Sequence, residues 1–274
     1  MNYSKINKIY IYCFSTKDYL FFKKFPNNII PIILGNLNVS NSYLKETDGE
    51  NISNLNKYYA EMTGVYWVLK NKIKFHNEND WIGVCHYRRL WLNSVSKRKK
   101  NFSNVFSKLL IEENSFPKNQ DSILVDPIYL KRETAFEQFV NNHGDEIFDF
   151  LHEILELDEY TDFKKHLNQR EFSPCNMFIT KPKIFIRYCD KVFPLLNRIL
   201  EECLKRNLCV GKNIKLPAFF IERYTPYWFK KNSKVGYLSY GVFNNFFLSN
   251  LTNIFLNPLK LPFSSSFFPT KLNI

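Results

Sequence analysis

One stretch of this 274-residue chain gathers side chains that could bind an anion. An apolar run at residues 81–85 has strand-like composition, and it is followed directly by His86, Tyr87, Arg88 and Arg89. Two adjacent guanidiniums suit a diphosphate, because they bind phosphate oxygens bidentately and stay charged at physiological pH. Since ligands of open α/β sheets sit at the carboxyl ends of strands, the stretch predicts a phosphate site there. The alternative is a solvated turn beside a histidine that packs in the interior.

The rest of the chain supplies the elements that would position this stretch. Short apolar runs predict buried strands at residues 9–14, 29–34, 123–125 and 177–179. Apolar residues at helical spacing predict helices over residues 55–70, over residues 144–155, and from Pro182 onward with a kink at Pro194. Residues 36–57 predict a long loop. Strands that alternate with helices predict an α/β fold with a mostly parallel sheet.

Composition narrows the class of protein. The formal net charge of +12 favours anionic partners, such as nucleotides, nucleic acid or a membrane surface. The lysines are dispersed and no nucleic-acid recognition motif is present, which argues against a nucleic-acid partner. Six scattered cysteines without metal-type spacing predict reduced core thiols in a cytoplasmic protein. No apolar stretch approaches the roughly 18 residues that a membrane-spanning helix needs, which predicts a soluble or peripheral protein.

Several blocks of the sequence, taken in order, resemble one bacterial family. They lie at residues 49–53, 58–67, 70–71, 82–89, 176–179 and 219–223. Together they resemble the HYRR-type glycosyltransferase family of capsule and O-antigen gene clusters, long labelled only as a domain of unknown function, some of whose members are similar to galactofuranosyltransferases. The resemblance covers about residues 5–235. The chain departs from the family pattern at Val125-Asp126, and no role is assigned there.

The resemblance implies both a fold and an activity. Residues 1–235 would form a GT-A-like domain, in which a nucleotide-sugar-binding sheet is flanked by helices. Residues 236–274 would be an aromatic and basic C-terminal extension suited to docking on a membrane or a partner. The implied reaction moves a sugar from a nucleoside diphosphate sugar, UDP-galactofuranose or a UDP-hexose, to a saccharide or lipid-linked acceptor during surface polysaccharide synthesis. It would take place in the cytoplasm, with peripheral association to the inner membrane.

The resemblance also bears on metal use. Better-known relatives of this architecture hold a divalent metal with an Asp-x-Asp motif, but no such motif occurs anywhere in this chain. Arg88 and Arg89, with Tyr87, are therefore expected to bind the donor diphosphate, since fixed cations can neutralise the charge that develops on it. No cofactor is expected. Mg²⁺ or Mn²⁺ held by His86 and distant carboxylates is the alternative.

The remaining candidates come from the later blocks and the loop. An inverting transfer needs a base for the acceptor hydroxyl, and Glu222 and His86 are the candidates. The alternative for Glu222 is an ordinary ion pair within a helix. The expected sugar and acceptor contacts are Asn51, Asn176, Glu61 and Arg223, of which Glu61 could instead be structural. The aromatic residues of the predicted helix, Tyr58, Tyr59, Tyr66 and Trp67, are expected in the core.

Two other function classes stay open at this point. One is a non-catalytic basic protein that binds nucleic acid or a partner enzyme, which the net charge of +12 would suit. The other is a phosphoryl-type transferase of a capsule cluster, since arginine-bound diphosphate serves that chemistry too.

Overall fold

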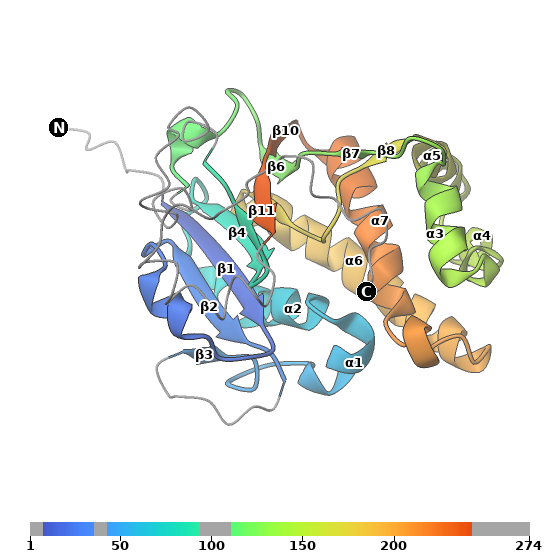
Figure 1. Ribbon diagram of the computed structural model, residues 1–274, viewed down its shortest axis with the longest axis horizontal. Coiled ribbons are helices and arrows are strands. Elements are labelled where there is room, and N and C mark those ends of the chain that lie inside the picture. The colour runs from blue at the N-terminus through green and yellow to red at the C-terminus, as the bar shows by residue number, and fades with distance from the viewer. Residues whose placement is uncertain (1–7, 36–42, 94–110, 243–274) are drawn as a thin grey trace, which may run out of the picture.

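A mixed sheet forms the centre of the computed structural model, which describes residues 8–35, 43–93 and 111–242 (Figure 1). The sheet order is β10-β6-β9-β4-β1-β2-β3, and β5 and β11 join it beside β4. The strands of this sheet are β1 (Ile9–Ser15), β2 (Ile29–Ile33), β3 (Leu44–Lys45), β4 (Trp81–His86), β5 (Arg89–Trp91), β6 (Ser122–Val125), β9 (Phe178–Thr180), β10 (Val235–Leu238) and β11 (Tyr240–Val242). Strands β1, β2, β3 and β4 run parallel, whereas β9 is antiparallel to its neighbours β4 and β6. The sheet therefore has the predicted α/β character.

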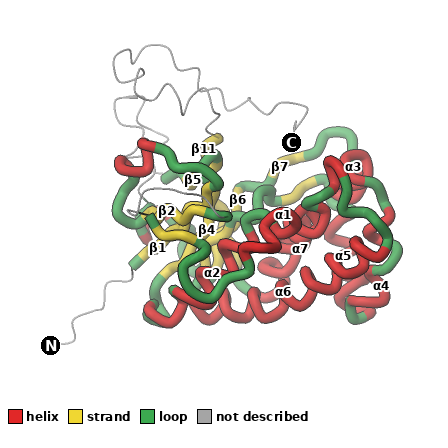
Figure 2. Tube along the Cα trace, turned by 90° about the horizontal axis from the view of Figure 1, so that it is seen from below, coloured by secondary structure: helices red, strands yellow, loops and turns green. Residues whose placement is uncertain are grey.

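Helices pack beside this sheet, as Figure 2 shows. They are α1 (Asn56–Tyr59), α2 (Met62–Asn71), α3 (Ala135–His143), α4 (Leu151–Ile154), α5 (Leu157–Leu167), α6 (Pro182–Lys205) and α7 (Leu216–Asn232). A separate pair of short strands, β7 (Ile128–Tyr129) and β8 (Glu171–Phe172), lies near α3 and α5 in Figure 1. Successive residues of β1 point to opposite faces of the sheet. Tyr12 and Phe14 pack in the hydrophobic cluster that contains α2, α6 and α7, whereas Ile11 and Cys13 pack in a second hydrophobic cluster.

Two glycines allow close packing in this core. A Cβ at Gly64 of α2 would lie 2.6 Å from the ring of Phe14, so α2 rests directly against β1. A Cβ at Gly83 of β4 would lie 2.8 Å from the side chain of Ile179. Both contacts are closer than a real Cβ tolerates, so glycine at these positions lets α2 sit close to β1, and lets β9 sit close to β4, the strand that ends at His86.

The helix predicted over residues 55–70 is interrupted. Helices α1 and α2 are separated at Ala60, whose φ of +47° is unfavourable for a residue with a Cβ. The Asn56 side chain stabilises this break by donating to the Ala60 carbonyl at 3.1 Å and to the Thr63 hydroxyl at 2.9 Å. The break leaves Glu61 at the start of α2, where its side chain can point toward the sheet edge.

Other predictions had mixed outcomes. The four predicted strands are confirmed, and α6 starts at Pro182 and continues through Pro194. The helix predicted over residues 144–155 is wrong, because only a 3-10 turn (Glu146–Phe148) and the short α4 form there. Helices α3, α5 and α7 had no predicted counterpart. All six cysteines are free thiols, and five of them are buried.

The C-terminal boundary expected after residue 235 falls inside a strand. Strand β10 pairs in parallel with β6, and β11 pairs with β5, so residues 236–242 belong to the same sheet as the rest of the domain. Residues 243–274, the remainder of the expected extension, lie outside the described residues. Across the parts of the chain that the structure describes, no helix is both long enough and apolar enough to cross a bilayer.

Candidate active site

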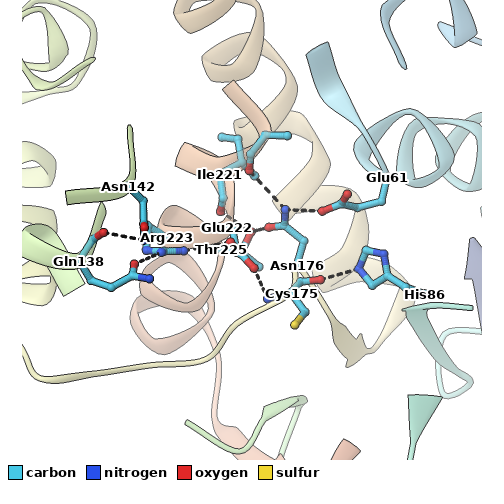
Figure 3. A network of polar contacts seen from close by, with 11 residues as sticks. Glu61, His86, Gln138, Asn142, Cys175, Asn176, Ile221, Glu222, Arg223 and Thr225 are labelled. Atoms are coloured by element: carbon cyan, nitrogen blue, oxygen red, sulfur yellow. Dashed lines mark hydrogen bonds and ion pairs between the residues drawn. The ribbon is translucent and has the colours of Figure 1, made fainter. Parts of the chain in front are cut away.

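The candidate site lies at the carboxyl end of β4. Because β9 is antiparallel to β4, with Phe178 opposite Val84, the residues just before β9 lie at the same edge of the sheet as His86. Arg89 begins β5 opposite His86. This edge is the one at which open α/β sheets bind ligands. Figure 3 shows that Glu61, Cys175, Asn176 and Glu222 meet there with His86.

A turn at Cys175 and Asn176 organises the site. Both residues are buried and both have positive φ, +81° and +47°, a conformation that a non-glycine residue keeps only when its surroundings enforce it. The Cys175 N–H donates to Glu222 Oε1 at 2.5 Å, and the Cys175 carbonyl accepts from His86 Nε2 at 2.6 Å. The backbone of Cys175 therefore connects the carboxylate of α7 with the imidazole of β4.

This contact fixes the tautomer of the neutral His86 ring. A carbonyl only accepts, so Nε2 must carry a hydrogen and Nδ1 of the neutral ring keeps its lone pair. Burial lowers the pKa of His86 below 6.5, and the nearby Arg89 also lowers it, against the opposing effects of Glu61 and Glu222. At neutral pH the ring is therefore uncharged, with Nδ1 able to accept a proton.

Asn176 connects three further elements. Its Nδ2 donates to Glu61 Oε1 at 2.7 Å and lies 3.4 Å from the Ala218 carbonyl at the start of α7. Its Oδ1 lies 3.0 Å from the Thr225 hydroxyl, which in turn lies 2.7 Å from the hydroxyl of Tyr188 on α6. The buried amide thus satisfies both of its ends and holds the Glu61 carboxylate in place.

Changing this amide to a carboxylate gives the first testable prediction. Asn176→Asp would replace the donor to Glu61 with a second negative charge, so we expect the free energy of unfolding at neutral pH to fall by about 2–4 kcal/mol. The loss should shrink as the pH falls, because protonation of one of the two carboxyl groups restores a donor. Denaturant unfolding at neutral and at mildly acidic pH measures it.

Asn51→Asp is the matched control for that measurement. Asn51 donates to the Gly49 carbonyl at 2.8 Å and accepts from the Ser53 hydroxyl at 2.7 Å within its own loop, where no carboxylate accepts its Nδ2. An equal loss of stability in both variants would show that Asn176 does not hold Glu61.

Glu222 is held from its other side. Arg223 donates to Glu222 Oε2 at 2.9 Å, and it also donates to the Gln138 side chain on α3. The Arg223 guanidinium is buried and lies 4.0 Å from the centroid of the Phe172 ring. The ion pair expected as the alternative for Glu222 is therefore present, and both carboxylate oxygens already accept a hydrogen bond.

The two neighbouring arginines have different surroundings. Burial lowers the pKa of Arg89, but the electrostatic effect of its neighbours is larger, so the pKa is raised overall. These neighbours are Cys175, Glu222, Glu61 and Tyr240. Within residues 8–35, 43–93 and 111–242, its guanidinium makes no ion pair or hydrogen bond with another residue. Arg89 is thus a half-buried cation beside the two carboxylates of the candidate site.

Arg88, in contrast, is exposed. Its guanidinium lies 5.3 Å from the centroid of the Tyr87 ring, and Tyr87 stacks on Tyr19 with a centroid distance of 5.1 Å. The turn between β4 and β5 thus leaves Arg88 exposed and Arg89 half-buried, and the binding of a diphosphate by both arginines stays a prediction.

The structure brings together six of the residues expected to act: Glu61, His86, Arg89, Asn176, Glu222 and Arg223. Among the described residues, the side chains of Asn51, Tyr87 and Arg88 make no hydrogen bond or ion pair with these six. Tyr59 and Trp67 are buried in the core as predicted, and Tyr58 and Tyr66 pack against it. The sequence reasoning missed Gln138, Cys175 and Thr225. The Pro174-Cys175-Asn176 order before a strand is a turn signal that could have drawn attention to Cys175, whereas Gln138 and Thr225 carry no such signal.

No set of metal ligands is evident in the part of the chain that the structure describes. There, no group of three or more His, Cys, Asp or Glu side chains is arranged to hold a metal ion. At the candidate site, Glu222 and Glu61 are already engaged by Arg223 and Asn176. Metal-independent action stays a prediction.

The chain is similar to a known protein structure and matches one protein family. The apo structure of WbbM, a bifunctional glycosyltransferase, is similar to this chain with a TM-score of 0.66 at 19% sequence identity, covering 87% of this chain and 46% of that one. The chain thus spans less than half the length of WbbM. The likeness establishes a GT-A-like α/β fold, with a mostly parallel sheet flanked by helices. No curated protein matches the chain. The match of residues 8–238 shows that the chain belongs to the family described as "Domain of unknown function (DUF4422)".

Proposed function

We propose that this protein is a glycosyltransferase that moves a sugar from a nucleoside diphosphate sugar to a hydroxyl of a saccharide or lipid-linked acceptor. One observation carries the proposal: an uncharged histidine and a half-buried arginine meet two carboxylates at the ligand-binding edge of a GT-A-like sheet. UDP-galactofuranose or a UDP-hexose as donor, and capsule or O-antigen synthesis as the setting, belong to the same proposal.

Arg89 would stabilise the leaving group. As the bond between the anomeric carbon and the diphosphate breaks, the electron pair leaves with the nucleoside diphosphate and negative charge grows on its oxygens. A fixed cation that makes no hydrogen bond or ion pair among the described residues meets that charge without having to break such contacts. The nearby Glu222 is paired with Arg223 and Glu61 with the Asn176 amide, so both carboxylates are held in place when the donor arrives.

His86 would act as the base. Its Nδ1 would take the acceptor hydroxyl proton as the acceptor oxygen forms the new bond to the anomeric carbon. Glu222 was the other candidate for this role, but each of its oxygens already accepts a hydrogen bond. We assign Glu222 to holding the Cys175 peptide, and through it the orientation of the His86 ring.

Donor screening tests the proposal. The purified protein would be incubated with UDP-, GDP- and dTDP-sugars and with saccharide and lipid-linked acceptors, with and without chelator, and the products measured by mass spectrometry. We expect acceptor mass to increase by one sugar residue, with equal rates in chelator. A gain of sugar plus phosphate would instead indicate the phosphoryl-type transferase. Thermal stabilisation by single-stranded DNA but by no nucleotide would indicate the nucleic-acid-binding alternative.

A further inference from the structure

The connection between α6 and α7 is unusually basic and apolar. From Cys203 to Ile221 the chain has no acidic residue, but it has four cations, Lys205, Arg206, Lys212 and Lys215. Three aliphatic side chains among them face solvent, with exposed fractions of 49% for Leu204, 52% for Val210 and 38% for Ile214. We call residues 204–215 the α6–α7 tip. Figure 1 places this connection at the lower right end of the molecule, away from the sheet.

The backbone of the α6–α7 tip is held in one conformation. Asn213, in the 3-10 turn Gly211–Asn213, donates to the His143 carbonyl of α3 at 2.8 Å and lies 3.2 Å from the ring nitrogen Nδ1 of His143. Gly211 has a φ of +54°, and a Cβ there would have no neighbour within 4 Å. The tip is therefore a turn that hydrogen bonds attach to α3, with open space around Gly211. Its exposed aliphatic side chains lie on this attached turn.

The C-terminal end of the α6–α7 tip leads directly into the helix that carries Glu222. Helix α7 starts at Leu216, and Glu222 lies six residues further, which is about 9 Å along the helix axis. Between them, the Ala218 carbonyl lies 3.4 Å from Asn176 Nδ2. A surface in contact with the tip would therefore lie within reach of an acceptor bound at the site.

We propose that the α6–α7 tip docks the protein on an anionic lipid surface. Aliphatic side chains that flank cations bind at the headgroup level, where the cations meet anionic lipids and the apolar groups leave water. Lys205 and Arg206 share the carboxylate of Glu202, whereas Lys212 and Lys215 have no ion pair within the described ranges and keep their full charge for the lipid. The inference goes beyond the proposed function, and rests on it only for the benefit that docking gives to a lipid-linked acceptor.

Vesicle co-sedimentation tests this inference with the full chain and no substrate. We expect binding to phosphatidylcholine vesicles that contain phosphatidylglycerol and little binding to phosphatidylcholine alone. Lys212→Glu/Lys215→Glu should weaken binding by at least about 30-fold, since each cation near an anionic surface contributes about 1 kcal/mol. Val210→Ser/Ile214→Ser should weaken it by about 10-fold or more through the lost apolar contact. Added salt should weaken binding of the wild type.

The matched control makes the same change of charge elsewhere on α6. Lys183→Glu/Arg187→Glu alters two exposed cations near the start of the helix and should leave binding within about 3-fold of the wild type. That small change is the effect expected from the lower net charge alone. Tip variants that bind as the wild type does, a control that weakens binding equally, or binding to neutral vesicles alone would overturn the inference. Transfer to a water-soluble acceptor should be unchanged in the tip variants, so vesicle binding and sugar transfer can fail separately.

Discussion

Arg89→Ala should lower the rate of sugar transfer by about 10²–10³-fold, the usual effect of removing one group that stabilises charge in a transition state. The reason is its placement: the Arg89 guanidinium is half-buried at the carboxyl end of β4 and has no ion pair or hydrogen bond among the described residues. The rate should fall in kcat as well as in kcat/KM, because the diphosphate charge grows as the bond breaks. Steady-state kinetics with the donor found by screening measures both.

Two variants control for this result. Arg88→Ala should lower the rate less than about 10-fold and leave the melting temperature unchanged, since Arg88 is exposed and its guanidinium lies beside the Tyr87 ring. Arg89→Lys keeps a positive charge beside Glu61 and Glu222, but it loses the planar pair of donors that fits a phosphate. Full activity in Arg89→Lys would mean that a positive charge at this position suffices without the planar pair of donors, and a larger loss in Arg88→Ala than in Arg89→Ala would reverse the assignment.

His86→Gln should lower kcat by about 10²–10⁴-fold, the range that a positioned acid or base contributes. Because burial lowers the pKa of His86 below 6.5, the wild-type rate should be constant at neutral and mildly alkaline pH. It should fall only as the pH drops through that lowered pKa, where the ring becomes protonated and Nδ1 no longer accepts. A pH profile of kcat/KM on the wild type measures this fall in rate at acidic pH, the acidic limb of the profile.

Glu61→Gln checks that the acidic limb belongs to His86. The negative charge of Glu61 raises the pKa of His86, so its removal should move the limb to lower pH, whatever the effect on the rate itself. The amide oxygen of the substituted side chain can still accept from the Asn176 amide, which protects the fold. A limb that keeps its position, or that remains unchanged in His86→Gln, would assign the titration to another group.

Much of the sheet could be predicted from the sequence, because buried strands and long amphipathic helices have a short-range apolar pattern. The runs that became β1, β2, β4, β6 and β9, and the helix that begins at Pro182, are of this kind. The break at Ala60 could not be predicted, because the apolar residues continue at helical spacing across it. The hydrogen bonds from the Asn56 side chain that stabilise the break leave no trace in that spacing. Helices α3 and α5 were missed for a related reason: both are short, and mean apolar content is low along each.

The sequence alone determined which side chains could do chemistry here, since residue type and adjacency at His86, Arg88, Arg89 and Glu222 are local properties. Only the tertiary structure decided which of them lie together. The separation of Arg88 from Arg89 follows from the turn between β4 and β5, and the link from Glu222 to His86 passes through the backbone of Cys175. That link joins residues far apart along the chain through backbone groups that nearly every residue has, so no residue type could have predicted it.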